Sequence, residues 1–164
     1  MATPLSRPQG RWVIGLSFLL ALILTIMPLP DWATSIRPEW VALTLVYWCI
    51  ALPQRVGVGT AWTLGLCLDI LKGGILGQHA LALTIIIFLV LKIHRQIRVY
   101  PLWQQALSIG ALILLNQMLV LWVNGIIGLE SMGWTYWLPS ISSAILWPWM
   151  FLILRDIRRN FGVR

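Results

Sequence analysis

Residues 37–81 read RPEWVALTLVYWCIALPQRVGVGTAWTLGLCLDILKGGILGQHAL and contain two apolar runs joined by a polar turn. The runs cover residues 40–52 and 56–71, and Pro53 in the turn between them interrupts helical hydrogen bonding. Three glycines lie on the second run: Gly57, Gly59 and Gly65. Glycine lowers helix propensity, but in lipid it lets neighbouring helix backbones approach closely. The stretch therefore predicts a hairpin of two helices suited to contact with other helices.

The composition of the whole chain indicates a membrane protein. Of its 164 residues, 59% are hydrophobic and 10% are charged, whereas a soluble domain has about 25% charged residues. The net charge of +7 does not favour nucleic-acid binding, because the basic residues form short clusters between apolar runs. We therefore expect an all-α integral membrane protein with a single polytopic domain over residues 1–164.

Six apolar runs are candidates for membrane-spanning helices, which predicts a six-helix transmembrane bundle with short loops. The runs cover residues 12–29, 40–52, 56–71, 75–93, 102–123 and 137–154. A crossing needs about 20 residues, so the two short hairpin arms fit either tilted spans or a re-entrant pair. A cleaved signal peptide is the competing interpretation of the first run, but Pro28, Pro30 and Asp31 separate that run from a candidate cleavage site.

The basic residues orient these spans. With the N-terminus in the cytoplasm, ten of the twelve Lys and Arg residues fall inside, and only Arg37 and Lys72 fall outside. The inside residues are Arg7, Arg11, Arg55, Lys92, Arg95, Arg98, Arg155, Arg158, Arg159 and Arg164. We expect Lys92, His94 and the two arginines that follow to form a basic loop after the fourth span. Both termini are then cytoplasmic.

Motifs that carry catalysis are absent from the sequence. There is no Walker-type phosphate loop, no His-Glu-x-x-His pair, no Gly-x-Ser-x-Gly elbow and no carboxylate pair within one span. His79 follows Asp69 by ten residues, and such a pair could relay protons or bind a metal. Because a third ligand or a nucleophile is missing, structural pairing is the favoured interpretation. We expect no enzyme activity, no metal and no cofactor.

Three polar residues within the apolar runs remain open to two interpretations each. Asp69 either attaches the hairpin to a partner or to Lys72, or it marks the point where the third helix leaves the lipid. Asn116 and Gln117 lie in the middle of the fifth run, where amides are costly unless they bond to another helix. They either hold helices together or line a substrate cavity.

Several short motifs follow one another along residues 37–81. They are Arg37-Pro38-x-Trp40, Tyr47-Trp48, Pro53-x-x-Val56-Gly57-Val58-Gly59-x-Ala61-Trp62, Gly65-Leu66-x-x-Asp69 and Gly77-Gln78-His79-Ala80-Leu81. Their order and spacing closely resemble the family of the rod shape-determining protein MreD, in particular its gamma-proteobacterial members. The resemblance covers about 45 residues at its strongest, and the rest of the chain agrees in length, in the number of spans and in its basic tail.

The resemblance implies a non-catalytic protein of the cell inner membrane that acts in the cell-elongation machinery. It implies partnership with the bitopic protein MreC, most directly, and with the filament protein MreB, RodA and a class B penicillin-binding transpeptidase. The family is also similar in fold to the substrate-binding subunits of energy-coupling-factor transporters, which does not by itself establish transport.

Two functions follow as hypotheses. The first is a scaffold that binds MreC and peptidoglycan-synthesis partners and contacts membrane lipid. A homo-oligomer of this scaffold is compatible with the sequence. The second is a small-molecule binding or transport subunit, with Asp69, His79, Asn116 and Gln117 around a polar cavity. The candidate residues for helix packing or partner binding are Arg37, Trp40, Pro53, Gly57, Gly59, Trp62, Gly65, Asp69, Gly77, His79, Asn116 and Gln117.

Overall fold

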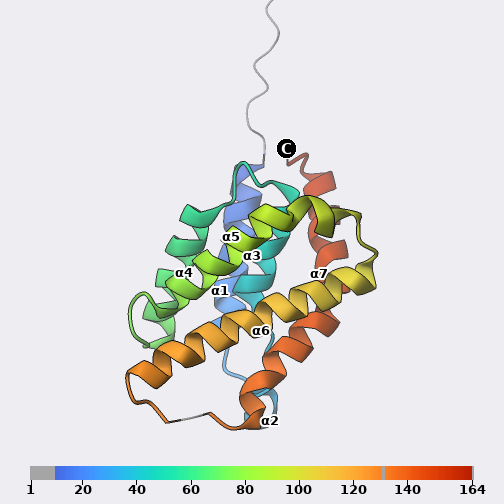
Figure 1. The fold of residues 1–164 in the computed structure, drawn as a ribbon. Helices are drawn as coiled ribbons and strands as arrows, with labels where there is room; N and C mark the ends of the chain where they lie inside the picture. Colours follow the sequence, from blue (N-terminus) through green and yellow to red (C-terminus); the bar gives the residue numbers. More distant parts are fainter. Residues whose placement is uncertain (1–9, 131, 164) are drawn as a thin grey trace, which may run out of the picture.

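The chain is all-helical in the computed structural model, which describes residues 10–130 and 132–163 (Figure 1). Within these residues there are seven α-helices and one short 3-10 helix. The elements are α1 (Arg11–Ile26), α2 (Asp31–Thr34), α3 (Trp40–Ala51), α4 (Val58–Lys72), α5 (Gln78–Val99), α6 (Leu102–Ile126), η1 (Trp134–Trp137) and α7 (Leu138–Asn160). Arg7 and Arg164, which the charge pattern places inside the cell, lie outside the described residues.

The expectation of six helices is wrong by one element. The additional helix is α2, a single turn in the segment that the sequence indicates as a loop. It begins directly after Pro30, whose φ of −57° already suits a helix start, and the Thr34 hydroxyl donates to the Asp31 carbonyl oxygen. With four residues it is about 6 Å long and cannot cross a membrane.

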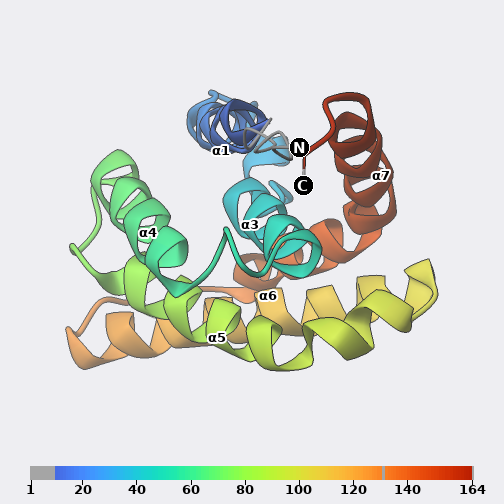
Figure 2. The same cartoon turned by 90° about the horizontal axis from the view of Figure 1, so that it is seen from above.

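Helix α3 lies at the centre of the molecule, surrounded by the other long helices (Figure 2). Every residue from Val41 to Ile50 is buried, as expected for a helix that is apolar on all sides. Its sides are covered by α1, α5 and α7, and the Trp48 indole donates a 2.8 Å hydrogen bond to the Ser17 hydroxyl on α1. Because α3 faces protein on all sides, it does not need the length of a lipid-facing span.

The predicted hairpin does not close on itself. Instead of packing on α3, helix α4 packs on α5, with which it shares its largest interface. The physical reason is that the small and acidic side of α4, carrying Gly65 and Asp69, faces the start of α5. The segment between α3 and α4 therefore connects two helices that have few contacts with each other.

Three helices within the described residues are long and apolar enough to cross a membrane. They cover Gln78–Val99, Leu102–Ile126 and Trp134–Asn160. The other long helices, α1, α3 and α4, have 16, 12 and 15 residues. At 1.5 Å per residue α3 is about 18 Å long, shorter than the hydrocarbon core of about 30 Å.

The basic loop expected after the fourth span is helical. Helix α5 continues through Lys92, His94, Arg95 and Arg98 and ends at Val99. Lysine and arginine favour helix, and the first strong stop is Pro101, which restricts the residue before it to extended backbone. Helix α7 likewise continues into the basic tail as far as Asn160, with Pro148 inside it.

The basic segments gather at one end of the molecule. The start of α1, the α3–α4 connection, the end of α5 and the end of α7 lie together at the top of Figure 1. The first and last helices meet there, because the Trp12 and Phe161 rings lie 5.2 Å apart, edge to face. The α4–α5 turn, α2 and the loop before η1 lie at the opposite end (Figure 1). We call these the basic end and the turn end.

Candidate functional site

Asp69 caps the start of α5 from the neighbouring helix. Its carboxylate is fully buried and accepts hydrogen bonds from the backbone N–H groups of Gly77, at 2.8 Å, and His79, at 2.9 Å. These N–H groups belong to the N-cap residue and the first turn of α5, where no intrahelical acceptor exists and where the helix dipole favours a negative charge. Gly77 takes a φ of +99°, a conformation that side chains disfavour, and this presents its N–H to the carboxylate.

Gly65 brings the two helices together one turn before Asp69. A Cβ at this position would lie 2.5 Å from the Ala80 backbone nitrogen and 2.9 Å from the His79 carbonyl carbon. Neither neighbour is a flexible side chain, so only glycine fits without moving a backbone. The close approach at Gly65 is what places the Asp69 carboxylate within reach of the α5 amides.

His79 extends this network towards the surface. Its Nδ1 lies 2.7 Å from Asp69 Oδ1, and its Nε2 lies 3.5 Å from Lys72 Nζ. Because an ammonium group can only donate, Nε2 is the acceptor and the ring proton sits on Nδ1, facing the carboxylate. Lys72 also lies 3.9 Å from Glu39 Oε2, so it does not pair with Asp69 as one interpretation of the sequence expected.

Helix α6 is tied to both of its neighbours by amide groups. The Gln78 side chain donates to the Val120 carbonyl oxygen at 3.0 Å and to Asn124 Oδ1 at 2.5 Å. Gln117 donates to the Tyr136 carbonyl oxygen, and the Tyr136 hydroxyl donates back to the Gln117 carbonyl oxygen, both at 2.9 Å. These bonds connect α6 to the start of α5 on one side and to η1 on the other.

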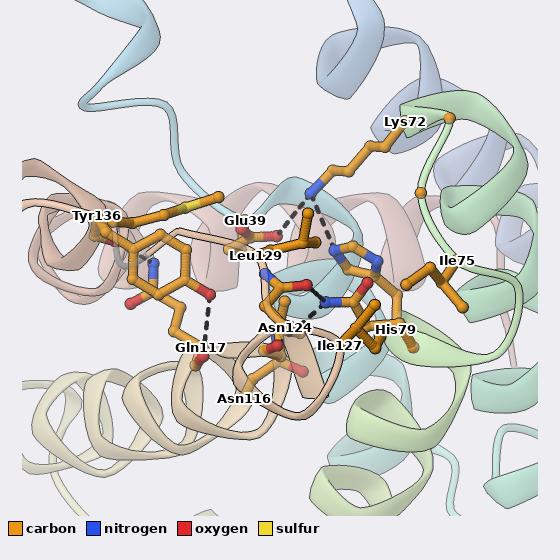
Figure 3. Close-up of a pocket in the computed structure, with 15 residues that line it drawn as sticks. Glu39, Lys72, Ile75, His79, Asn116, Gln117, Asn124, Ile127, Leu129 and Tyr136 are labelled. Atoms are coloured by element: carbon orange, nitrogen blue, oxygen red, sulfur yellow. Dashed lines mark hydrogen bonds and ion pairs between the residues drawn. The ribbon is translucent and has the colours of Figure 1, made fainter. Parts of the chain in front are cut away.

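The network surrounds a cavity of about 560 Å³ at the turn end (Figure 3). Its walls come from the α4–α5 turn, the second half of α6 and the loop that leads to η1. The residues that line it are Glu39, Lys72, Gly73, Gly74, Ile75, Gln78, His79, Asn116, Gln117, Val120, Asn124, Ile127, Leu129, Met132 and Tyr136. The volume lies within the range of known small-molecule sites, about 300–1,000 Å³.

Two amide oxygens on the α6 wall lack partners among the described residues. Asn116 and Gln117 are each 3% exposed, and neither Asn116 Oδ1 nor Gln117 Oε1 has a hydrogen-bond donor nearby. The orientation of Gln117 is set by its own chemistry, because its Nε2 must face the Tyr136 carbonyl oxygen. A buried acceptor without a donor is unfavourable, but each of these two oxygens has almost no accessible surface of its own, so neither is open to the cavity that the side chains line.

Half of the residues expected from the sequence come together at this end. Gly77 and His79 are both hydrogen-bonded to Asp69, and Gly65 packs beside them. His79, Asn116 and Gln117 line the cavity, whereas Asp69 lies behind His79 and does not. Asn116 and Gln117, for which the sequence allows two interpretations, therefore line the same cavity.

The remaining expected residues lie elsewhere. The Arg37 guanidinium donates to the carbonyl oxygens of Thr25 and Met27, at the end of α1, where helix carbonyls lack intrahelical donors. Trp40 begins α3 and is half-buried. Pro53 and Gly57 lie in or beside the α3–α4 connection. Gly59 and Trp62 lie on the exposed side of α4.

Of the fifteen residues that line the cavity, twelve are missing from the sequence-based set, and these include the polar residues Glu39, Gln78, Asn124 and Tyr136. One signal was available for Asn124, because residues 116, 120 and 124 repeat every four positions and share a helix face. Gln78 is adjacent to His79, but the sequence-based set contains only His79. For Tyr136 no pattern existed, since it reaches α6 from a 3-10 turn across a loop.

The site carries no recognisable catalytic or metal-binding arrangement. Among residues 10–130 and 132–163, no three His, Cys, Asp or Glu side chains gather closely enough to hold a metal ion. Both carboxylate oxygens of Asp69 are engaged in capping α5 or orienting His79. The arrangement is suited to holding helices in register around a cavity whose wall includes polar and apolar side chains.

The chain matches known proteins over nearly its whole length. The family described as "rod shape-determining protein MreD" matches residues 6–157. A curated "Rod shape-determining protein MreD" from Haemophilus influenzae is 33% identical over 151 residues, covering 92% of this chain and 93% of the relative. No solved structure matches. The chain belongs to the rod shape-determining MreD family, membrane proteins that determine cell shape and are not known as enzymes.

Proposed function

We propose that this chain is a non-catalytic subunit of the inner membrane that scaffolds the cell-elongation complex. The observation that carries the proposal is the family match over residues 6–157 under the description of a rod shape-determining protein. The proposed direct partner is MreC, with MreB, RodA and a class B penicillin-binding transpeptidase in the same complex. Because the sequence carries none of the catalytic motifs named above, we infer that it determines shape through other proteins.

The exposed side of α4 is the proposed partner surface. We define this surface by Val58, Gly59, Trp62, Thr63, Cys67, Ile70 and Leu71, all of them exposed. A Cβ at Gly59 would have no atom within 4 Å, so the notch there is unfilled within the protein. Notches beside large apolar side chains are where membrane helices pack most closely. A single membrane helix of a partner would fit against this surface, as would a second copy of the chain.

We propose that the basic end faces the cytoplasm. The meeting of α1 and α7 at that end supports an even number of crossings. Clustered arginines and lysines at cytoplasmic helix ends also attract anionic lipid, and the filament protein MreB would meet the same surface. Reporter fusions at the two ends test this orientation. Activity of a cytoplasmic reporter at one end and a periplasmic reporter at the other would contradict it.

The experiment for the scaffold role is depletion in rod-shaped cells combined with cross-linking. Depletion is expected to produce rounded cells and a displaced elongation complex. Cys67 is exposed on the α4 surface whereas Cys49 is buried, so a thiol cross-linker on the native chain should capture a neighbour through Cys67 alone. Normal rod shape after depletion would contradict the scaffold role. Cross-linking only to a second copy would indicate that the α4 surface forms a homo-oligomer instead of binding another protein.

A second candidate function is small-molecule binding, which the cavity at the turn end supports. The similarity to energy-coupling-factor transporter subunits is part of this candidate and rests on the sequence resemblance. A transport role predicts that an external solute rescues depleted cells, whereas a scaffold role predicts that no solute does.

A further inference from the structure

A groove of about 340 Å³ runs between α1 and α7, with α3 as its floor. The two helices stand apart on either side of α3 (Figure 2), and the rings of Trp12 and Phe161 meet at the basic end. Leu16, Leu20 and Ile153 line the groove and are 52%, 58% and 57% exposed. The ring pair therefore marks the basic end of the groove, which is open along its side to the surroundings of the bundle.

The surface of the groove is almost entirely apolar. Its two hydroxyl groups are already engaged, because Ser17 donates to the Ile14 carbonyl oxygen at 2.7 Å and Thr44 donates to the Trp40 carbonyl oxygen at 2.8 Å. A molecule in the groove finds hardly any free hydrogen-bonding group, which favours a hydrocarbon. In a bilayer such a groove does not stay empty, since unfilled space forfeits the dispersion contacts of its lining.

The dimensions of the groove favour one lipid chain over a protein helix. On α1 the lining residues run from Trp12 to Leu24, a rise of about 18 Å, whereas the hydrocarbon of one leaflet is about 15 Å thick. Over this length the volume gives a mean cross-section of about 19 Å², close to that of one extended hydrocarbon chain. A helix about 10 Å wide has a cross-section of about 80 Å², so it would rest on the edges of the groove without filling it.

Arginines lie beside the basic end of the groove. Arg158 follows the lining residue Leu154 by four positions and is therefore near the same side of α7, and the next residue, Arg159, is exposed. The only acid of α7, Asp156, lies 3.8 Å from Arg155. Arg158 and Arg159 form no ion pair with any of the described residues. Guanidinium groups in this position favour an anionic headgroup that carries a phosphate.

We propose that the groove binds one acyl chain of an anionic phospholipid, with the phosphate beside Arg158 and Arg159. Every membrane lipid offers the groove the same kind of hydrocarbon, so selection comes from the headgroup, and the arginines select for negative charge. The inference extends the lipid attraction proposed for the basic end to one built site. It does not depend on the scaffold role, and its test uses the purified protein, so the failure of one leaves the other intact.

The test is lipid binding by the purified full chain, measured by native mass spectrometry. After delipidation, the protein is titrated with phosphatidylglycerol or with phosphatidylcholine of identical acyl chains. We expect one phosphatidylglycerol to bind at about fivefold lower concentration than phosphatidylcholine, the effect of one arginine beside an anionic headgroup. Equal binding of the two lipids would overturn the proposal.

Charge variants connect this preference to the end of the groove. The double variant Arg158→Gln with Arg159→Gln should bind the two lipids alike. Lys92→Gln with Arg95→Gln removes the same charge from exposed positions on α5 and is the matched control, which should keep the preference. Equal loss in both variants would assign the preference to the overall charge of the basic end. That result, or an unchanged preference in the α7 variant, would overturn the proposal.

A second pair of variants tests the groove itself. Leu20 lines the groove and Leu19 does not, and they are 58% and 53% exposed, so a larger side chain at either position leaves the core in place. Leu20→Trp should weaken phosphatidylglycerol binding severalfold, whereas Leu19→Trp should retain it. Equal binding by both variants would overturn the assignment to the groove. Loss of a protein dimer in Leu20→Trp with unchanged lipid binding would assign the groove to a second copy of the chain, which also overturns it.

The native chain provides a direct measurement that needs no variant. Phosphatidylglycerol with a photoactivatable group on its acyl chain is cross-linked to the protein in detergent, and the labelled residues are identified by mass spectrometry. Labels should concentrate on the groove residues of α1 and α7, such as Leu16, Leu20 and Ile153. Labels spread evenly over the exposed residues of all long helices would contradict a built site.

Discussion

The two sides of α4 carry similar residues in very different surroundings. On the inner side, a Cβ at Gly65 would meet the backbone of α5, and Asp69 is fully buried one turn later. On the outer side, Gly59 has no neighbour within 4 Å and Trp62 is 43% exposed. The inner side therefore holds the protein together, whereas the outer side is free for another molecule.

The difference follows from helical geometry. Residues six apart on an α-helix are rotated by about 240°, so Gly59 and Gly65 cannot share a face. Glycine in a membrane helix indicates close packing without identifying the neighbour. For Gly65 the neighbour is α5 of the same chain, and for Gly59 we propose that it is a partner. Four substitutions test this division, in order of expected loss of stability.

Gly65→Leu should have the largest effect. Even its Cβ would clash with the Ala80 and His79 backbone, and the two helices would have to separate and lose the Asp69 cap. Overpacking of this kind costs about 1–3 kcal/mol, and loss of the cap adds to it. Thermal unfolding in detergent should show a large drop in melting temperature or failure to purify as a folded protein. A melting temperature equal to that of the native chain would show that the inner side is not tightly packed.

Asp69→Asn should have the next largest effect. An asparagine keeps the shape, but it loses the charge and one of the two acceptor oxygens that serve Gly77 and His79. Hydrogen bonds to a charged group contribute about 1.5–3 kcal/mol, and the helix dipole adds to this interaction. We expect faster amide hydrogen exchange in the first turn of α5 and weaker assembly, with normal membrane insertion.

Asp156→Asn is the control for the loss of charge. Asp156 is 63% exposed and lies 3.8 Å from Arg155, a contact of the kind that contributes little. Its exchange rates should match those of the native chain. Equal behaviour of the two variants would mean that Asp69 only marks the end of α4.

Much of the fold could be predicted from the sequence, because composition and run length decide the class of fold. The apolar runs predicted α1, α3, α6 and the start of α7 closely. The apolar run stops short of the end of α5, because Lys92, Arg95 and Arg98 predict a loop at that point. Charge ends a lipid-facing span, but lysine and arginine favour helix, so the backbone continues past the apolar run.

The site was only partly predictable because its bonds join segments that are distant in the sequence. Asp69 and His79 stood out as polar residues among apolar ones, and so did Asn116 and Gln117. Their neighbours Glu39 and Tyr136 did not, because a charged residue at a helix start and a tyrosine in a loop are ordinary there. The packing of α4 on α5 instead of α3 was also hidden, since both arrangements satisfy the same apolar pattern.

Lys72→Gln should have a small effect on stability. Lys72 is at the end of α4, 3.9 Å from Glu39 and 3.5 Å from His79, and its side chain is 36% exposed. Exposed ion pairs contribute about 0–1 kcal/mol and are screened by salt. The melting temperature should fall slightly at low salt and match that of the native chain at high salt. A large, salt-independent loss would place Lys72 with Asp69 on the inner side.

Gly59→Leu should leave folding intact, and it tests the outer side directly. No atom lies within 4 Å of a Cβ at this position, and leucine favours helix more than glycine by up to about 1 kcal/mol, so the melting temperature should stay the same or rise. Co-purification with MreC should fall, because the notch beside Trp62 would be filled. Gly125→Leu on α6, also without a neighbour within 4 Å, is the matched control and should retain the partner. Equal co-purification of MreC with both variants would show that the α4 surface is not part of the interface with MreC. Loss in both would mean that the partner contacts more than one side of the bundle.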